Sequence, residues 1–387
     1  MPRRSPPDSA PPGSAPVVLD AGLAVFELVR PLGQGHHGEL LLTRQRYHEG
    51  PGGYSVLKRL NRVARQEDYQ RLVEEARLGG QLHHPNIVFV QQLSGTAEEP
   101  FLVVEYVEGD VLGELMRLAS GQDLRLSEAF CCHVTAEVAE GLGFAHSIAD
   151  ERGRPLGVVH RHVTPQGIIV SRHGEVKLMD FGAAWSRLEG RISTEGDSDV
   201  GPLAYSSPER TMLDPLDGRS DLFSLGVVLL ELLTGRHLFE ATARHEAELR
   251  SRQLRARGDF PGADRVPGLE ELGVVRTHDL TRRIRKLTSQ QVQEATRGLP
   301  EGLRSILHRA LAPRPVDRFA TAAEMARALR EYQWASCGPR YGHPELKAEV
   351  SALHAAALKA LVPPPSSTRK QVGATSRRRR KVSPKES

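Results

Sequence analysis

Alternating apolar and polar positions dominate the first hundred residues, and a period of two is typical of β-strands. The alternation begins at about Ala24, and strand-like residues return at 40–42, 54–58 and 101–106. Between the last two runs, apolar residues spaced as in a helix extend from Tyr69 to Leu78. The first part of the chain is therefore predicted to be a sheet with one helix, which stops at Gly79-Gly80.

Helical periodicity dominates the rest of the chain. A helix is predicted at 127–149 with Ser127 as its N-cap, and Ser220-Asp221 is predicted to cap an apolar helix from Leu222 to Leu233. Two short apolar runs, Ile168–Val170 and Val176–Met179, flank a polar turn and predict a β-hairpin between these helices. The fold class is therefore α+β.

A glycine-rich stretch between the first two predicted strands has the pattern Gly-x-Gly-x-x-Gly, with glycines at Gly33, Gly35 and Gly38. In a dinucleotide-binding fold this pattern opens a helix. Here a strand-like run follows, so the glycines are predicted to lie at a hairpin tip whose backbone amides could close over phosphates. An ordinary glycine-rich turn is the alternative, and the pattern alone does not separate the two.

Polar motifs then follow in a fixed order along the chain. They are Lys58 at a strand end, Glu75 in the predicted helix, the turn His84-Pro85-Asn86-Ile87-Val88, the loop His160-Arg161-His162, Asp180-Phe181-Gly182, and Ser207-Pro208-Glu209. This series resembles protein kinases, most closely bacterial Ser/Thr kinases of the eukaryotic type. The resemblance covers about Leu23 to Glu331.

The resemblance implies a bilobal protein-kinase-like fold, with an antiparallel-sheet N-lobe at 23–107 and a mainly helical C-lobe at 108–333. It also implies ATP and Mg²⁺ as ligands, with a Lys58–Glu75 ion pair holding the ammonium against the nucleotide phosphates. Spacing from the His-Pro turn selects Glu75 rather than Glu74. The remaining implied roles are adenine contacts by Val104, Glu105 and Val107, metal binding by Asp180, and pairing of Arg318 with Glu209.

Three positions depart from the family pattern. The catalytic aspartate is replaced by His162, and the Mg²⁺-binding asparagine five residues later is replaced by Gly167. Gly79 stands four residues after Glu75, where the family usually has a bulky apolar residue. We expect the loss of this side chain to let the helix swing outwards and break the Lys58–Glu75 pair.

These departures favour a pseudokinase that still binds ATP, with weakened Mg²⁺ binding, and acts as a scaffold or allosteric partner. The alternative is an active Ser/Thr kinase in which Asp180 alone holds metal and His162 or water replaces the base. For His162 itself, we expect a ring that fills the loop and hydrogen-bonds backbone, in preference to a substitute base or a metal ligand.

The remaining segments fall outside the resemblance or interrupt it. Residues 1–22 are predicted to be a disordered Pro/Ser-rich leader, about 245–297 a charged helical insertion, 334–362 a helical extension, and 363–387 a disordered tail. The tail has eight Lys/Arg and one acid, a net charge of +7, which leaves −3 for the rest of the chain. It suits nucleic acid or an acidic surface, although a solvated tail is an equal alternative. Three cysteines and no apolar run of membrane-spanning length favour a cytoplasmic protein.

Overall fold

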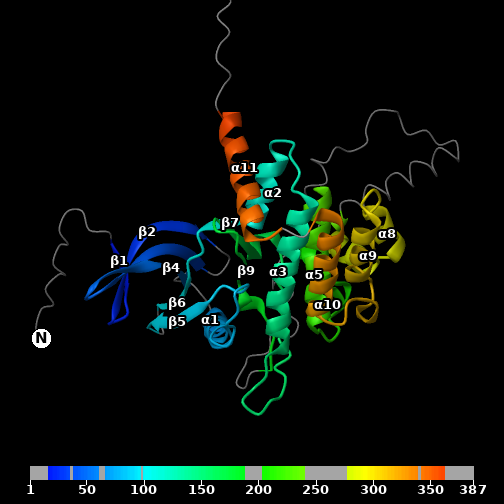
Figure 1. Ribbon diagram of the computed structural model, residues 1–387. Helices are drawn as coiled ribbons and strands as arrows, with labels where there is room; N and C mark the ends of the chain where they lie inside the picture. Colours follow the sequence, from blue (N-terminus) through cyan, green and yellow to red (C-terminus); the bar gives the residue numbers. More distant parts are fainter. Residues whose placement is uncertain are drawn as a thin grey trace, which may run out of the picture.

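The computed structural model describes residues 16–34, 38–60, 66–96, 99–187, 203–239, 277–338 and 341–361. Within these ranges the chain forms a sheet-rich lobe with one helix and a larger, mainly helical lobe (Figure 1). The predicted α+β bilobal fold is therefore confirmed. The N-lobe sheet and the segment 160–182 meet where Lys58 on the sheet contacts Asp180, and we call the region around this contact the cleft.

The N-lobe sheet has six antiparallel strands in the order β1-β2-β3-β4-β6-β5. The strands are β1 (Val17–Asp20), β2 (Ala24–Gln34), β3 (Gly38–Tyr47), β4 (Gly50–Leu60), β5 (Val90–Gly95) and β6 (Pro100–Glu105). The leader predicted over 1–22 is wrong at its end, because Val17 to Asp20 pair with β2 and bury Leu19 beneath the sheet. One face of the sheet holds a small core formed by Leu19, Phe26, Leu41, Leu57, Phe101 and Val103.

The N-lobe helix, α1 (Gln66–Gly79), lies between this sheet and the C-lobe (Figure 1). Its buried residues include Leu72, Leu78 and Glu75. A glutamate is rarely buried without a partner, and the partner of Glu75 is Lys58.

The C-lobe is built around α3 (Glu128–Ser147) and α5 (Gly218–Thr234), both largely buried. Ser127 caps α3 as predicted, since its Oγ accepts a hydrogen bond from the backbone N–H of Phe130. The predicted cap of α5 is wrong: Asp217 accepts from the N–H of Arg219, and Asp221 lies inside the first turn. That leaves the Asp221 carboxylate buried and able to accept other donors.

Further helices surround this pair. They are α2 (Leu112–Ser120), α4 (Pro208–Met212), α7 (Thr277–Arg285), α8 (Ser289–Ala295), α9 (Glu301–Ala310), α10 (Ala322–Tyr332) and α11 (His343–Leu361). A three-stranded sheet, β7 (Gly109–Val111), β8 (Ile168–Ser171) and β9 (Val176–Leu178), faces the N-lobe. Its antiparallel pair β8–β9 confirms the predicted hairpin.

A buried ion pair joins α4 to the end of the C-lobe. The Nη1 and Nη2 atoms of Arg318 donate to Oε1 and Oε2 of Glu209 at 2.6 and 2.8 Å, respectively. The Arg318 side chain is fully buried. Such an arrangement is the bidentate form in which arginine binds carboxylates most strongly. The pairing implied by the resemblance is therefore present.

Only part of the stretch 245–297 lies within the described residues. That part, 277–297, contains α7 and α8, whose Ile284 and Val292 are buried in the C-lobe core. These two helices therefore belong to the packed lobe. The tail 363–387 lies outside the described residues.

The helical extension forms α11, which lies beside α2 (Figure 1). Its apolar stripe of Leu346, Val350 and Leu353 is buried. Polar contacts add to this packing, because the Glu349 carboxylate accepts from the backbone N–H and Oγ of Ser127 at 2.8 and 2.7 Å. Among the described helices, none is both long enough and apolar enough to cross a membrane.

Candidate functional site

Three charged groups from three elements meet in the cleft. The Nζ of Lys58, on β4, lies 2.7 Å from Oε2 of Glu75 on α1 and 3.1 Å from Oδ1 of Asp180. Glu75 is thus the glutamate of the pair that contacts the lysine. Although burial alone would lower the pKa of Lys58, the two carboxylates outweigh it and raise that pKa, so the ammonium stays charged.

Asp180 is presented to the cleft by an unusual backbone conformation. Its φ of 70° and ψ of 61° are left-handed, a region that non-glycine residues adopt at a cost. The Lys58 ammonium holds the pKa of the Asp180 carboxyl well below its usual range; burial opposes this, and a hydrogen bond from His162 adds to it. Asp180 is therefore an ionised carboxylate.

Gly182 lies directly against the same ion pair. A Cβ at this position would lie 2.6 Å from Oε2 of Glu75 and 3.3 Å from Nζ of Lys58. Because a contact below 3.0 Å forces a shift, a larger residue at position 182 would require the Glu75 carboxylate to move.

His162 occupies the other side of Asp180. Its Nδ1 lies 3.1 Å from Oδ2 of Asp180, while Lys58 holds Oδ1. An ionised carboxylate can only accept, so Nδ1 carries the proton of this hydrogen bond. The expectation that His162 merely bonds backbone is wrong, because its imidazole contacts the carboxylate that the family uses for metal.

The buried Asp221 carboxylate anchors the backbone of the loop that carries His162. Oδ2 and Oδ1 of Asp221 accept hydrogen bonds from the backbone N–H groups of His160 and Arg161, each at 2.8 Å. The Nε2 of His146 also lies 2.8 Å from Oδ2 of Asp221. Burial would raise the pKa of Asp221, but the hydrogen bonds from His146 and the loop outweigh it and lower that pKa. Sequence reasoning missed this anchor; a carboxylate inside an apolar helix was the available signal.

His160 supports the loop from inside the core. It is fully buried, its Nε2 lies 3.1 Å from the Met179 carbonyl, and its Nδ1 accepts the His162 N–H at 3.1 Å. Burial lowers the pKa of His160 to about 4, so the ring is neutral near pH 7. Its edge-to-face contact with Phe181, at 4.4 Å between centroids, joins the loop to the Asp180 segment.

Gly167 stands at the end of the loop, directly before β8. A Cβ here would lie 3.4 Å from the His162 carbonyl, 3.6 Å from Thr164 Oγ1 and 3.8 Å from the Met179 carbonyl. These are ordinary contacts, so the backbone leaves room for a Cβ atom. Position 167 therefore lacks a side-chain oxygen ligand only because its residue is glycine.

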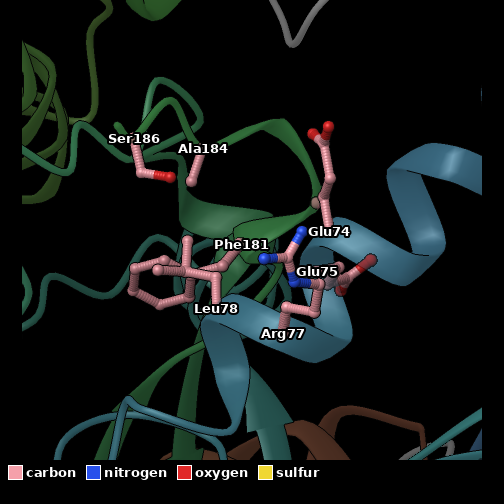
Figure 2. Close-up of a pocket in the computed structure, with 8 residues that line it drawn as sticks. Glu74, Glu75, Arg77, Leu78, Phe181, Ala184 and Ser186 are labelled. Carbon is pink, nitrogen blue, oxygen red and sulfur yellow. The ribbon is translucent and has the colours of Figure 1, made fainter. Parts of the chain in front are cut away.

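The expected effect of Gly79 is wrong, since α1 holds Glu75 against Lys58. The reason is Val90 on β5: a Cβ on Gly79 would lie only 2.3 Å from Val90 Cγ2. Val90 thus fills the space that a larger residue at 79 would use. Leu78 and Phe181 also line a small pocket between α1 and the segment after Asp180 (Figure 2).

The predicted adenine residues lie where β6 runs into β7. Val104 and Glu105 end β6, and Val107 lies in the connection to β7. Glu105 is itself anchored, with its carboxylate 3.0 Å from the Lys177 ammonium. Of the glycines, Gly33 and Gly38 lie on the facing ends of β2 and β3, and Gly35 lies outside the described residues. The predicted hairpin of β2 and β3 is confirmed.

A family model for the protein kinase domain matches residues 26–334. The chain therefore belongs to the protein kinase family. A double mutant of the Mycobacterium tuberculosis PknI kinase domain has the same fold, with a TM-score of 0.51 and 21% identity, covering 82% of this chain and 98% of that one.

Two protein kinases are each 30% identical to this chain over the matched residues. Tyrosine-protein kinase MasK of Myxococcus xanthus is 30% identical over 333 residues, which cover 84% of this chain and 46% of MasK. Serine/threonine-protein kinase PknB of Mycobacterium leprae is 30% identical over 262 residues, which cover 66% of this chain and 35% of PknB. The chain spans less than half the length of either relative.

Protein kinases generally use ATP and Mg²⁺, with the metal held by an aspartate and an asparagine. The residues present do not fit that metal well. Gly167 offers no side-chain oxygen, and both oxygens of Asp180 already accept N–H donors. No group of three or more potential metal-ligating His, Cys, Asp or Glu residues occurs within the described ranges.

Proposed function

We propose that this protein is a pseudokinase, a protein-kinase-like signalling protein that binds ATP and transfers phosphate poorly or not at all. The observation that carries the proposal is the contact of Lys58 with Glu75 and Asp180, the residue types that position nucleotide in the family, beside a loop with His162 in the aspartate position. Such a protein would act as a scaffold or allosteric partner, with nucleotide setting how its lobes close.

Three arguments support retained nucleotide binding. The Lys58–Glu75 contact is short and shielded, so the ammonium is positioned for phosphate oxygens. The hinge residues Val104, Glu105 and Val107 occupy the positions that contact adenine in the family. Gly33 and Gly38 lie on the facing ends of β2 and β3, where a glycine leaves its backbone amide accessible to a phosphate.

Two arguments oppose normal phosphate transfer. The family aspartate accepts the substrate hydroxyl and orients it. The His162 Nδ1 donates to Asp180, which leaves Nε2 as the acceptor of a neutral ring that lacks the negative charge and compact geometry of a carboxylate. Loss of a positioned acid–base group typically lowers a rate by ~10²–10⁴. At the second position, Gly167 lacks the side-chain oxygen with which the family's asparagine binds a Mg²⁺ ion.

The second candidate is an active protein kinase with an atypical loop. The observation that favours it is the support of that loop by Asp221 on α5, whose first turn is held in place by Arg318 of the Glu209–Arg318 pair through the Arg219 carbonyl. In this case Asp180 would contact the metal alone. The relatives are named for tyrosine in one case and serine/threonine in the other, and we place the substrate of this candidate among Ser/Thr hydroxyls of proteins.

The test is transfer of the ATP γ-phosphate in three proteins measured side by side. They are the wild type, Asp180→Asn, and the double variant His162→Asp with Gly167→Asn. We expect a silent wild type that ATP nevertheless stabilises thermally, and transfer that arises only in the double variant. Wild-type transfer that disappears in Asp180→Asn would overturn the pseudokinase proposal and establish the second candidate.

A further inference from the structure

The remaining question concerns how ATP binds where the metal ligands are incomplete. We propose that His162 takes over the side of Asp180 that a metal would use, so that this cleft binds nucleotide without a divalent cation. The inference rests on the proposed nucleotide binding and adds that it is independent of metal.

The first step is the engagement of both Asp180 oxygens. Oδ1 accepts from the Lys58 ammonium and Oδ2 from the His162 imidazole, each at 3.1 Å. Mg²⁺ requires nearly ideal octahedral geometry, with oxygen ligands at about 2.0–2.1 Å. A metal on either oxygen would therefore share it with an N–H group directed at the same atom.

The second step is the anchoring of the His162 backbone. The backbone N–H of His162 donates to Nδ1 of the buried His160, and Asp221 accepts from the backbone N–H groups of the two residues before His162. The imidazole therefore starts from a fixed backbone, and its Nδ1 reaches Oδ2 of Asp180. Leaving Asp180 to admit a metal would require the side chain to turn out of this contact.

The third step is the lack of a second oxygen ligand. At Gly167 a Cβ atom would make only ordinary contacts, but the residue supplies no side-chain oxygen. Glu75, the nearest further carboxylate named in the site, is turned to Lys58 at 2.7 Å and is buried. Of these site residues, only Asp180 would then bind the metal, while Lys58 and His162 still donate hydrogen bonds to its two oxygens.

The fourth step is the charge that a triphosphate meets. In an ordinary kinase the metal neutralises the aspartate and the phosphates together. Here Lys58 and His162 cover the two Asp180 oxygens, so less negative charge faces the nucleotide. Metal-free binding is therefore reasonable in this cleft, where an uncovered aspartate would repel ATP.

The experiment measures ATP affinity of the full chain by calorimetry, once with Mg²⁺ and once with a chelator. For the wild type we expect the two dissociation constants to agree within about twofold, whereas His162→Asp with Gly167→Asn should bind about tenfold or more tightly with Mg²⁺ than without it. Gly167→Asn alone is the second variant, because its Cβ makes only ordinary contacts. The matched control is His173→Asp, an exposed histidine in the β8–β9 turn, which should retain the wild-type ratio.

Each outcome has a distinct meaning. Equal wild-type affinities, with metal dependence appearing in the double variant, support the inference. ATP binding by the wild type that requires Mg²⁺ overturns the inference but leaves the proposed function standing. The absence of ATP binding in both conditions overturns the inference together with the proposed nucleotide binding.

Discussion

The two sides of the catalytic loop differ in how closely they follow the protein kinase pattern. The inner side follows the pattern: Asp221 accepts two loop N–H groups and His160 packs on Phe181. Arg318, which pairs with Glu209, also donates to the Arg219 carbonyl at the start of α5, the helix that carries Asp221. The outer side, which faces the cleft, carries His162 and Gly167 where the family has aspartate and asparagine. The residues that hold the loop and the residues that do its chemistry are thus separable.

This difference has a physical basis. Inner-side groups are buried, so replacing one leaves an unpaired donor, acceptor or charge and lowers the free energy of unfolding. On the outer side, the His162 side chain is only partly buried, so its replacement costs function with little loss of stability. A chain can therefore lose phosphate transfer and retain the fold, which is the pattern we propose for this protein.

The largest effect should come from the inner side. Glu209→Ala leaves the Arg318 guanidinium buried without its carboxylate, and removing one partner of a buried ion pair typically costs about 3–5 kcal/mol of unfolding free energy. The measurement is urea unfolding followed by circular dichroism.

The control for this substitution is Glu108→Ala, which breaks an exposed pair with Arg172. Exposed pairs contribute about 0–1 kcal/mol, so this variant should unfold close to the wild type. Equal losses in the two variants would contradict the division between an inner and an outer side.

An effect of intermediate size should come from pH. Because the pKa of His160 is about 4 in the folded protein and the unperturbed value is about 6.5, the unfolded state binds the proton first as pH falls. His160 therefore leaves stability unchanged above pH ~6.5 and lowers it by roughly 3 kcal/mol in total as pH falls to about 4. The charged or titratable groups that act on this ring are Asp221, His162 and Asp180.

The check is the pH dependence of the unfolding free energy in the wild type and in His160→Gln. A glutamine amide retains a donor for the Met179 carbonyl and cannot take up the proton. The variant should show a shallower decrease between these pH values. An unchanged slope would mean that His160 is not protonated on unfolding in this range.

The smallest effect concerns the packing behind α1. Gly79→Ala places a Cβ 2.3 Å from Val90 Cγ2, and overpacking of this kind typically costs about 1–3 kcal/mol. Thermal unfolding of Gly79→Ala, Val90→Ala and the double variant measures it. The double variant should be more stable than the sum of the single losses predicts, and strict additivity would show that the two positions do not share one space.

Much of the site was predictable because its motifs are local and ordered. The resemblance to protein kinases implies the roles of Lys58, Glu75 and Asp180, and spacing from the His-Pro turn selects Glu75. In the structure the Lys58 ammonium contacts Glu75 at 2.7 Å and Asp180 at 3.1 Å. The β8–β9 hairpin and the Ser127 cap follow from neighbouring residues, so a short window of sequence contains what determines them.

The features that sequence did not predict depend on residues brought together by folding. His162 meets Asp180 from 18 positions away, Asp221 reaches the loop from 60 positions away, and Val90 fills the space beside Gly79 from another element. Strand β1 escaped prediction for a related reason. Its four residues follow a Pro/Ser-rich segment and gain their structure from pairing with β2.

The packing of α11 has a practical consequence for recombinant work. The family match stops at residue 334, yet Leu346, Val350 and Leu353 beyond it are buried. A protein shortened to the family boundary would expose the apolar surface of α2 and remove the Glu349 carboxylate from Ser127. Fragments for crystallisation or display should therefore extend through Leu361, because a cut at the family boundary would leave an exposed apolar patch that is prone to aggregation.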